Sequence, residues 1–154
     1  MRWLRLVLLI GHLHLAGCQS VRSDGPAGRM APCGALPNCY RSGAAQPPWH
    51  LADASLAGWQ AFMAELRLRE RWSLITEADG YVHFLVRTPL LRFADDVEFR
   101  LALPAGTVSY RSASRLGISD LGANRQRLEA LAAELVTAGL LQTVGATSET
   151  TADE

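Results

Sequence analysis

The sequence contains no lysine, only three cysteines and four histidines, and no tract of consecutive basic residues. Its formal net charge is +0, and without a basic patch nothing argues for nucleic-acid binding. The histidines are scattered, and His12 and His14 lie close to the N-terminus. Because a zinc site needs about four Cys, His or carboxylate ligands, the chain lacks a recognisable ligand set. We therefore expect no metal and no cofactor, and no known catalytic signature is present.

The first 17 residues have the layout of a secretory signal peptide. Arg2 and Arg5 supply a basic start, Leu6–Ile10 begins a short apolar core, and small residues precede Cys18. The apolar run is far shorter than the ~20 residues that a lasting transmembrane helix needs. We expect residues 1–17 to be removed and to take no part in the fold.

The residues around the cleavage point suggest a lipid anchor. The segment Leu15-Ala16-Gly17-Cys18 resembles the lipobox of bacterial lipoproteins. The resemblance implies diacylglyceryl attachment to the Cys18 sulfur, cleavage before Cys18 and acylation, including palmitate, at the new N-terminus. Several acyl chains hold a protein firmly on a membrane, since each buried methylene adds ~0.8 kcal/mol. Gln19, rather than Asp, after the cysteine implies the periplasmic face of the outer membrane.

Cys33 and Cys39 remain once Cys18 is assigned to lipid. They are separated by five residues in "CGALPNC", and Pro37-Asn38 supplies turn residues. An oxidising cell envelope permits a disulfide between them. Two free thiols or a metal pair are the alternatives, and the absence of further ligands disfavours the metal. We expect the disulfide.

Composition divides the remaining chain into three parts. Residues 18–32 are rich in Ser, Gly, Pro and Arg and are expected to form a tether. Residues 33–141 have the length of a single globular domain. Residues 142–154 show no hydrophobic periodicity and are expected to be a disordered tail.

Hydrophobic periodicity inside the domain predicts a helix, four strands and a second helix. The expected elements are a helix over 53–69, strands over 72–76, 81–87, 97–103 and 107–112, and a helix over 124–138. Short connections between consecutive strands favour an antiparallel sheet. The expected fold is α+β, with an antiparallel sheet of about four strands and two helices packed on one face.

Two polar stretches, "FADDVEF" and "RSASRLGISDLGANR", stand out within this pattern. With Leu103 opposite Val108, the hairpin places Asp96 opposite Arg115 and Arg100 opposite Arg111. Glu98 then lies diagonal to both Arg111 and Arg115, whereas Asp95 points to the other face. Such a network is either purely structural or part of a ligand site.

The segment after the fourth strand has the character of an anion-binding loop. Asp120 and Asn124 are good helix N-caps, and backbone N–H groups at a helix N-terminus attract anions. We expect Ser112, Ser114, Ser119 and Arg125 to surround it. The candidate ligand-binding residues are Asp96, Glu98, Arg111, Ser112, Ser114, Arg115, Asp120, Asn124 and Arg125.

Catalysis has weaker support. A serine nucleophile at position 112, 114 or 119 needs a base, and nothing in the spacing joins a serine to His50 or His83. Asp95-Asp96 is a poor acid–base or metal pair, because adjacent residues of a strand point to opposite faces.

The same motifs carry a family resemblance. "CGALPNC", "FADDVEF" and "RSASRLGISDLGANRQRLE" resemble the three motifs of the family called domain of unknown function 1499, over roughly residues 33–140. Tyr40 stands where the family usually has Val. Occurrence of the family in bacterial envelopes and photosynthetic organelles implies an extracytoplasmic domain, but no reaction.

The sequence thus predicts a non-enzymatic lipoprotein of the bacterial cell envelope. Its polar surface would bind a small anion, a lipid headgroup or an envelope protein. A hydrolase that uses the same Asp, Glu, Arg and Ser residues is the alternative.

Overall fold

A computed structural model describes residues 29–143 of the chain. The expected signal peptide at 1–17, the lipidation site Cys18, most of the tether and nearly all of the expected tail lie outside the described residues. Within residues 29–143, no helix is long and apolar enough to cross a bilayer.

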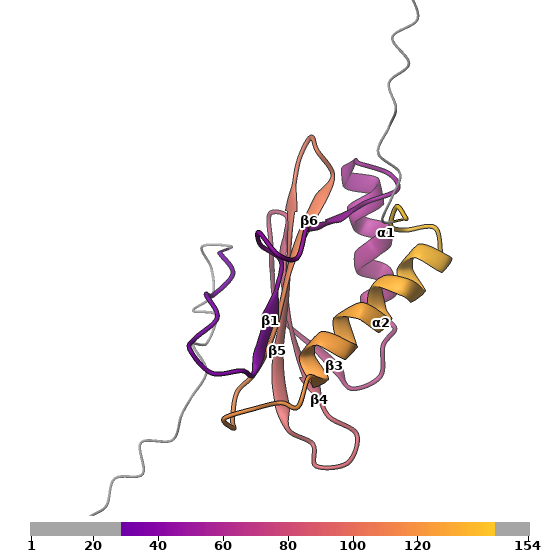
Figure 1. Cartoon of the computed structure of the whole chain (residues 1–154). Coiled ribbons are helices and arrows are strands. Elements are labelled where there is room, and N and C mark those ends of the chain that lie inside the picture. Colours follow the sequence, from indigo (N-terminus) through magenta and orange to yellow (C-terminus); the bar gives the residue numbers. More distant parts are fainter. Residues whose placement is uncertain (1–28, 144–154) are drawn as a thin grey trace, which may run out of the picture.

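The described part is an α+β fold with two helices and an antiparallel sheet of six strands. Figure 1 shows both helices on the same face of the sheet, as expected. In chain order the elements are β1 (Cys39–Arg41), β2 (Trp49–His50), α1 (Leu56–Arg67), β3 (Trp72–Ala78), β4 (Tyr81–Arg87), β5 (Ala94–Ala102), β6 (Thr107–Ser114) and α2 (Ala123–Thr137).

The expected count of about four strands was too low, because two short strands precede α1. The sheet order is β1-β6-β5-β4-β3, and β2 also pairs with β6. β1 has three residues and β2 has two, and Pro47 and Pro48 lie between them. Segments this short carry no alternating pattern of their own. Backbone pairing with the edge of β6 forms them, and that pairing is a tertiary effect.

Local sequence explains the first helix well. Ser55 caps α1, and its side-chain oxygen accepts hydrogen bonds from the N–H groups of Ala57 and Gly58. The buried residues of the helix, at i, i+3, i+4 and i+7, are Trp59, Phe62, Met63 and Leu66. This single apolar stripe packs α1 onto the sheet.

The β5–β6 hairpin differs from its expected register by two residues. Leu101, not Leu103, lies opposite Val108, and the loop is residues 103–106. Gly106 ends the loop at a φ of +63°, and a Cβ there would come within 2.5 Å of the Ala54 Cβ. The position therefore requires glycine, which fixes where the turn ends. A shift of two residues keeps each side chain on its expected face but changes its partners.

The hydrophobic core lies between the sheet and the helices. The core side chains of the three central strands are Val82, Phe84, Val86, Val97, Phe99, Leu101, Val108 and Tyr110. They pack against α1 and against Leu128, Leu131 and Leu135 of α2. The opposite face of the sheet carries polar side chains that are also buried. Buried polar residues also lie on the helix-facing side, beside the apolar core, so the candidate site residues are divided between the two faces of the sheet.

Candidate functional site

Strand alternation separates the polar residues into two networks. Asp95, Ser112 and Ser114 face the helices, whereas Asp96, Glu98 and Arg111 face away from them. We call the first set, completed by Asn124 and Arg127 of α2, the inner network. We call the set on the far face the outer network, and its members are Tyr81, His83, Asp96, Glu98, Arg111 and Arg115.

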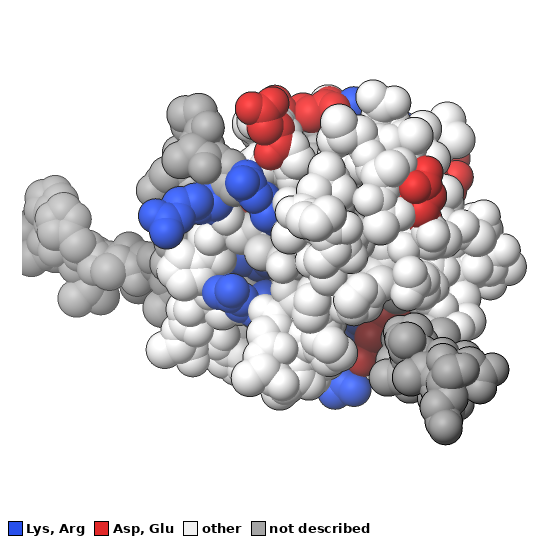
Figure 2. Space-filling model, turned by 90° about the horizontal axis from the view of Figure 1, so that it is seen from above, with Lys and Arg blue, Asp and Glu red and all other residues white. Residues whose placement is uncertain are grey.

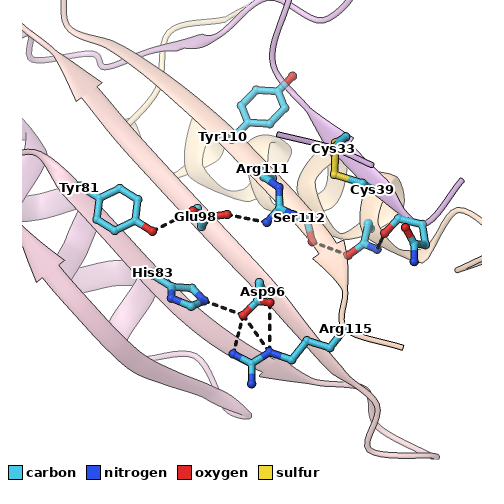
Figure 3. A network of polar contacts seen from close by, with 12 residues as sticks. Cys33, Cys39, Tyr81, His83, Asp96, Glu98, Tyr110, Arg111, Ser112 and Arg115 are labelled. Atoms are coloured by element: carbon cyan, nitrogen blue, oxygen red, sulfur yellow. Dashed lines mark hydrogen bonds and ion pairs between the residues drawn. A yellow bond between two sulfur atoms is a disulfide. The ribbon is translucent and has the colours of Figure 1, made fainter. Parts of the chain in front are cut away.

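The outer network consists of two rows that run across the sheet from β4 through β5, the first to β6 and the second to Arg115, which follows β6 directly (Figure 3). In the first row, Glu98 accepts hydrogen bonds from the Tyr81 hydroxyl at 2.8 Å and from Arg111 Nη1 at 2.6 Å. Glu98 and Arg111 are 0% and 1% exposed, so their ion pair is fully buried. Glu98 lies directly opposite Arg111, and Arg100 lies opposite Ser109 instead of Arg111.

The second row is centred on Asp96. Arg115 donates to both carboxylate oxygens, at distances of 2.7 to 3.1 Å, and His83 Nε2 lies 2.7 Å from Oδ1. The direct register partner of Asp96 is Ala113, so Arg115 lies diagonal to Asp96 and not opposite it as expected. Burial alone would raise the pKa of Asp96, but the hydrogen bonds from His83 and Arg115 outweigh burial and lower this pKa to about 2. The hydrogen bonding between Arg115 and Asp96 also raises the pKa of Arg115.

The inner network connects β5 and β6 to α2. Arg127 forms an ion pair with Asp95, and its Nη1 also donates to Ser112 Oγ at 2.8 Å and to Asn124 Oδ1 at 2.7 Å. The fully buried Asn124 donates from Nδ2 to Ser114 Oγ at 3.1 Å. It also donates to the backbone oxygen of Asn38 at 3.0 Å.

The N-terminus of α2 is occupied by a carboxylate of the chain itself. The N–H groups of Gly122 and Asn124 donate to the two carboxylate oxygens of Asp120, and the Ala123 N–H donates to its backbone oxygen. Gly122 is the N-cap residue in a left-handed conformation, so Asp120 caps from two positions earlier. Arg125 is exposed and pairs with Glu129 on the same helix, away from the other candidate residues.

A cleft of about 280 Å³ opens beside the inner network. It lies between the β4–β5 connection, residues 88–93, and the β6–α2 connection, residues 115–122. The lining residues are Thr88, Phe93, Asp95, Ser114, Leu116, Gly117, Ser119, Asp120 and Ala123. Two of the expected ligand-binding residues, Ser114 and Asp120, therefore meet at one cleft, and Asp95, which was not among them, joins them there.

Positive charge is concentrated elsewhere. Figure 2 shows arginine side chains gathered on the side of the sheet away from the helices. Arg41 is the register partner of Arg111, and Arg100 and Arg115 face the same side. The ionisable side chains that line the cleft are carboxyls, whereas Arg41, Arg100 and Arg115 face the other side of the sheet.

Sequence reasoning missed Tyr81, His83 and Arg127. Tyr81 and His83 alternate with the core residues Val82 and Phe84, which was a usable signal that they share a face with Asp96 and Glu98. Arg127 follows Asn124 at i+3, so it lies on the same side of α2.

The arrangement of serines and histidines bears on catalysis and metal binding. His83 faces away from the helices and the serines at 112 and 114 face toward them, so the sheet separates them. Residues 29–143 contain no group of three or more His, Cys, Asp or Glu side chains placed to hold a metal ion.

The expected disulfide is present. Cys33 and Cys39 are bonded, with their Cα atoms 5.7 Å apart. Asn38 lies inside the closed loop, and its backbone oxygen accepts from the Ser114 N–H at 2.9 Å. Its side-chain amide donates to the Gly117 oxygen at 2.8 Å. The disulfide loop therefore packs directly against the end of β6 and the loop that follows.

Comparison with known proteins supports one assignment. A family model described as "Protein of unknown function (DUF1499)" matches residues 29–135. No curated protein and no solved structure matches the chain. The family match spans both polar networks, the disulfide loop and most of the described fold, and the chain belongs to the DUF1499 family.

Proposed function

We propose that the protein is a non-enzymatic binding module, held by lipid at Cys18 on the periplasmic face of the bacterial outer membrane. The lipobox-like segment Leu15–Cys18 and the disulfide support this location, since disulfides persist in oxidising compartments. The binding surface is the cleft between residues 88–93 and 115–122.

One observation carries the binding role: exposed apolar side chains gather at the cleft, whereas the charged groups of the outer network are engaged with one another. Asp96, Glu98, Arg111 and Arg115 pair with one another in the outer network. The cleft, in contrast, is bordered by the exposed side chains of Phe93 and Leu116. Exposed apolar groups clustered at a concavity are typical of a binding surface.

Among the expected partners, an envelope protein has the best support. The helix N-terminus that would attract an anion is already bonded to Asp120. The carboxyls in the lining, Asp95 and Asp120, also disfavour a phosphate or an anionic lipid headgroup. A protein partner can cover the apolar rim without bringing negative charge into the cleft.

The geometry gives less support to a hydrolase. Ser112 donates to Asn124 and accepts from Arg127, and Ser114 accepts from Asn124, so both hydroxyls take part in fixing α2. His83 bonds to Asp96 on the opposite face. A serine nucleophile activated by that histidine would require rearrangement of the sheet.

Membrane attachment can be tested with matched cysteine variants. Cys18→Ser should release the protein from the membrane fraction and abolish labelling with radioactive palmitate. The control is the double variant Cys33→Ser/Cys39→Ser, which removes more cysteines but should stay membrane-bound and labelled. Retention of Cys18→Ser in the membrane would contradict the anchor.

Binding at the cleft can be tested with a neutral apolar dye such as Nile red. The variant Leu116→Ser/Leu121→Ser should reduce dye fluorescence several-fold. The control Leu68→Ser/Leu74→Ser replaces two exposed leucines that do not line the cleft and should leave the fluorescence unchanged. Equal dye fluorescence of the two variants would show that the cleft is not the binding surface.

A further inference from the structure

The floor of the cleft holds a buried carboxylate, Asp95, with one oxygen that lacks a partner in the described part of the chain. Asp95 is 1% exposed and is among the most deeply buried of the lining residues. Its Oδ2 pairs with Arg127, but Oδ1 is buried and has no hydrogen-bond partner among residues 29–143. A buried carboxylate oxygen without a donor is costly, and a ligand that supplies an N–H would relieve the cost.

The other polar groups of the lining are also suited to accept hydrogen bonds. Thr88 Oγ1 already accepts from the Phe93 N–H and Ser119 Oγ from the Leu121 N–H, and each hydroxyl oxygen has a second lone pair for a further donor. Among the described residues, neither Lys nor Arg lines the cleft, and the nearby Arg127 is engaged by Asp95 Oδ2, Ser112 and Asn124. The ligand group that fits is therefore a donor with positive charge.

The walls and surroundings of the cleft are apolar. Phe93 and Leu116 line it directly, and the two connections that form it expose four more large apolar side chains. These are Leu90, Leu91, Ile118 and Leu121, and Leu90 and Leu121 are 89% and 91% exposed. A ligand that matches this site has an aliphatic stem and a cationic end, and further apolar groups beside it.

We propose that the cleft binds a lysine or arginine side chain of a partner polypeptide. The inference rests on the proposed binding function and names the chemistry that the partner presents. The aliphatic stem packs between Phe93 and Leu116, and the charged end donates toward Asp95. Neighbouring apolar residues of the partner cover the exposed leucines of residues 88–93 and 115–122.

Two other occupants fit the site less well. A free amine would leave the six exposed apolar side chains in water, because it is much smaller than the surface they form. A membrane would cover them, but bacterial membrane surfaces carry negative charge, and the carboxyls of Asp95 and Asp120 would oppose close approach. A polypeptide satisfies both the charge and the area.

Matched peptides test the charge preference. The probes are acetylated, amidated tripeptides with the sequence Leu-X-Leu, in which X is lysine, neutral norleucine or glutamate. Each is titrated into the full-length chain while the amide NMR signals of Thr88, Ser119 and Ala123 are followed. We expect the lysine peptide to bind roughly tenfold more tightly than the norleucine peptide, and the glutamate peptide more weakly still.

Variants assign the preference to the cleft. Asp95→Asn should bring the lysine-to-norleucine affinity ratio close to one. Because that change also removes the ion pair of Arg127, Leu116→Ala provides a second test at an exposed position. It should weaken both peptides while keeping their ratio, whereas the control Leu74→Ala should alter neither.

The outcomes separate the two proposals. Equal binding of the lysine and norleucine peptides overturns the cationic ligand but leaves an apolar binding surface in place. If no peptide shifts the three amide signals, the inference is wrong, and the dye experiment alone decides the proposed function. If phosphatidylcholine vesicles shift those signals and the lysine peptide does not, the occupant is a membrane and the inference is again wrong.

Discussion

The outer and inner networks hold similar residue types but connect different parts of the molecule. The outer network runs between neighbouring strands, since Tyr81, Glu98 and Arg111 belong to β4, β5 and β6. The inner network leaves the sheet, and Asn124 joins β6 both to α2 and to the disulfide loop. The first holds strands to strands, and the second holds other elements to the sheet.

The two networks also differ in how much they depend on ion pairs. The outer network relies on buried ion pairs, which are costly to break because each leaves an uncompensated charge. The inner network has one ion pair, Asp95–Arg127, and its other hydrogen bonds join neutral groups to one another or to the Arg127 guanidinium. Damage to the outer network should therefore destabilise the whole fold, and damage to the inner network should first loosen α2 and the cleft.

The largest effect is expected from Arg111→Ala. The change leaves Glu98 buried without its ion pair, so the free energy of unfolding should fall by about 3–5 kcal/mol. Urea denaturation followed by circular dichroism measures it. Arg125→Ala is the matched control, because its pair with Glu129 is exposed, and it should change stability little. Similar midpoints for the two variants would mean that the buried pair has no special role.

A smaller loss is expected from Asn124→Ala. Ser112, Ser114 and the Asn38 oxygen would each lose a partner, which should cost about 2–3 kcal/mol. Hydrogen exchange should rise first in residues 115–122 and at the start of α2, before the strands. Gln126→Ala, an exposed change in the same helical turn, is the control. Uniform loss of protection across the sheet would contradict the division between the networks.

The smallest effect concerns the pH dependence due to Asp96. Its pKa is about 2 in the folded protein and 3.8 ordinarily, so the unfolded chain takes up this proton first as pH falls. The resulting stabilisation, about 2 kcal/mol, is complete above pH ~4 and is lost as pH falls toward 2.

Asp96→Asn tests this directly. The difference in unfolding free energy between wild type and variant should shrink as pH falls from 5 to 2. The exposed Glu129→Gln serves as the control and should give a difference that changes little with pH. A constant difference for Asp96→Asn would exclude Asp96 as a source of acid sensitivity.

The fold and the faces of its strands could largely be predicted from the sequence. Alternation around Val97 and Phe99 placed Asp96 and Glu98 on one side and Asp95 on the other, as observed. Periodicity also located both helices. These features depend on local spacing, which sequence reports directly.

The partners of the polar residues could not be predicted as well. Arg111 pairs with Glu98 rather than facing Arg100, because the hairpin loop ends at Gly106, where Ala54 leaves no room for a side chain. Arg127 was missed because its partner, Asp95, is 32 residues away. The cleft likewise forms from two connections that have no periodic pattern. Each of these features depends on contacts between distant segments.

Asn38 has a consequence for the order in which the molecule assembles. The loop between Cys33 and Cys39 closes over a few residues, so it can form while most of the chain is still unmade. Its attachments to the domain include the hydrogen bonds of Asn38 with Gly117 and Asn124, which are 79 and 86 residues away. Closing so long a separation is entropically costly and depends on the sheet already being in place. The first part of the domain to be synthesised is therefore expected to be among the last to reach its final position.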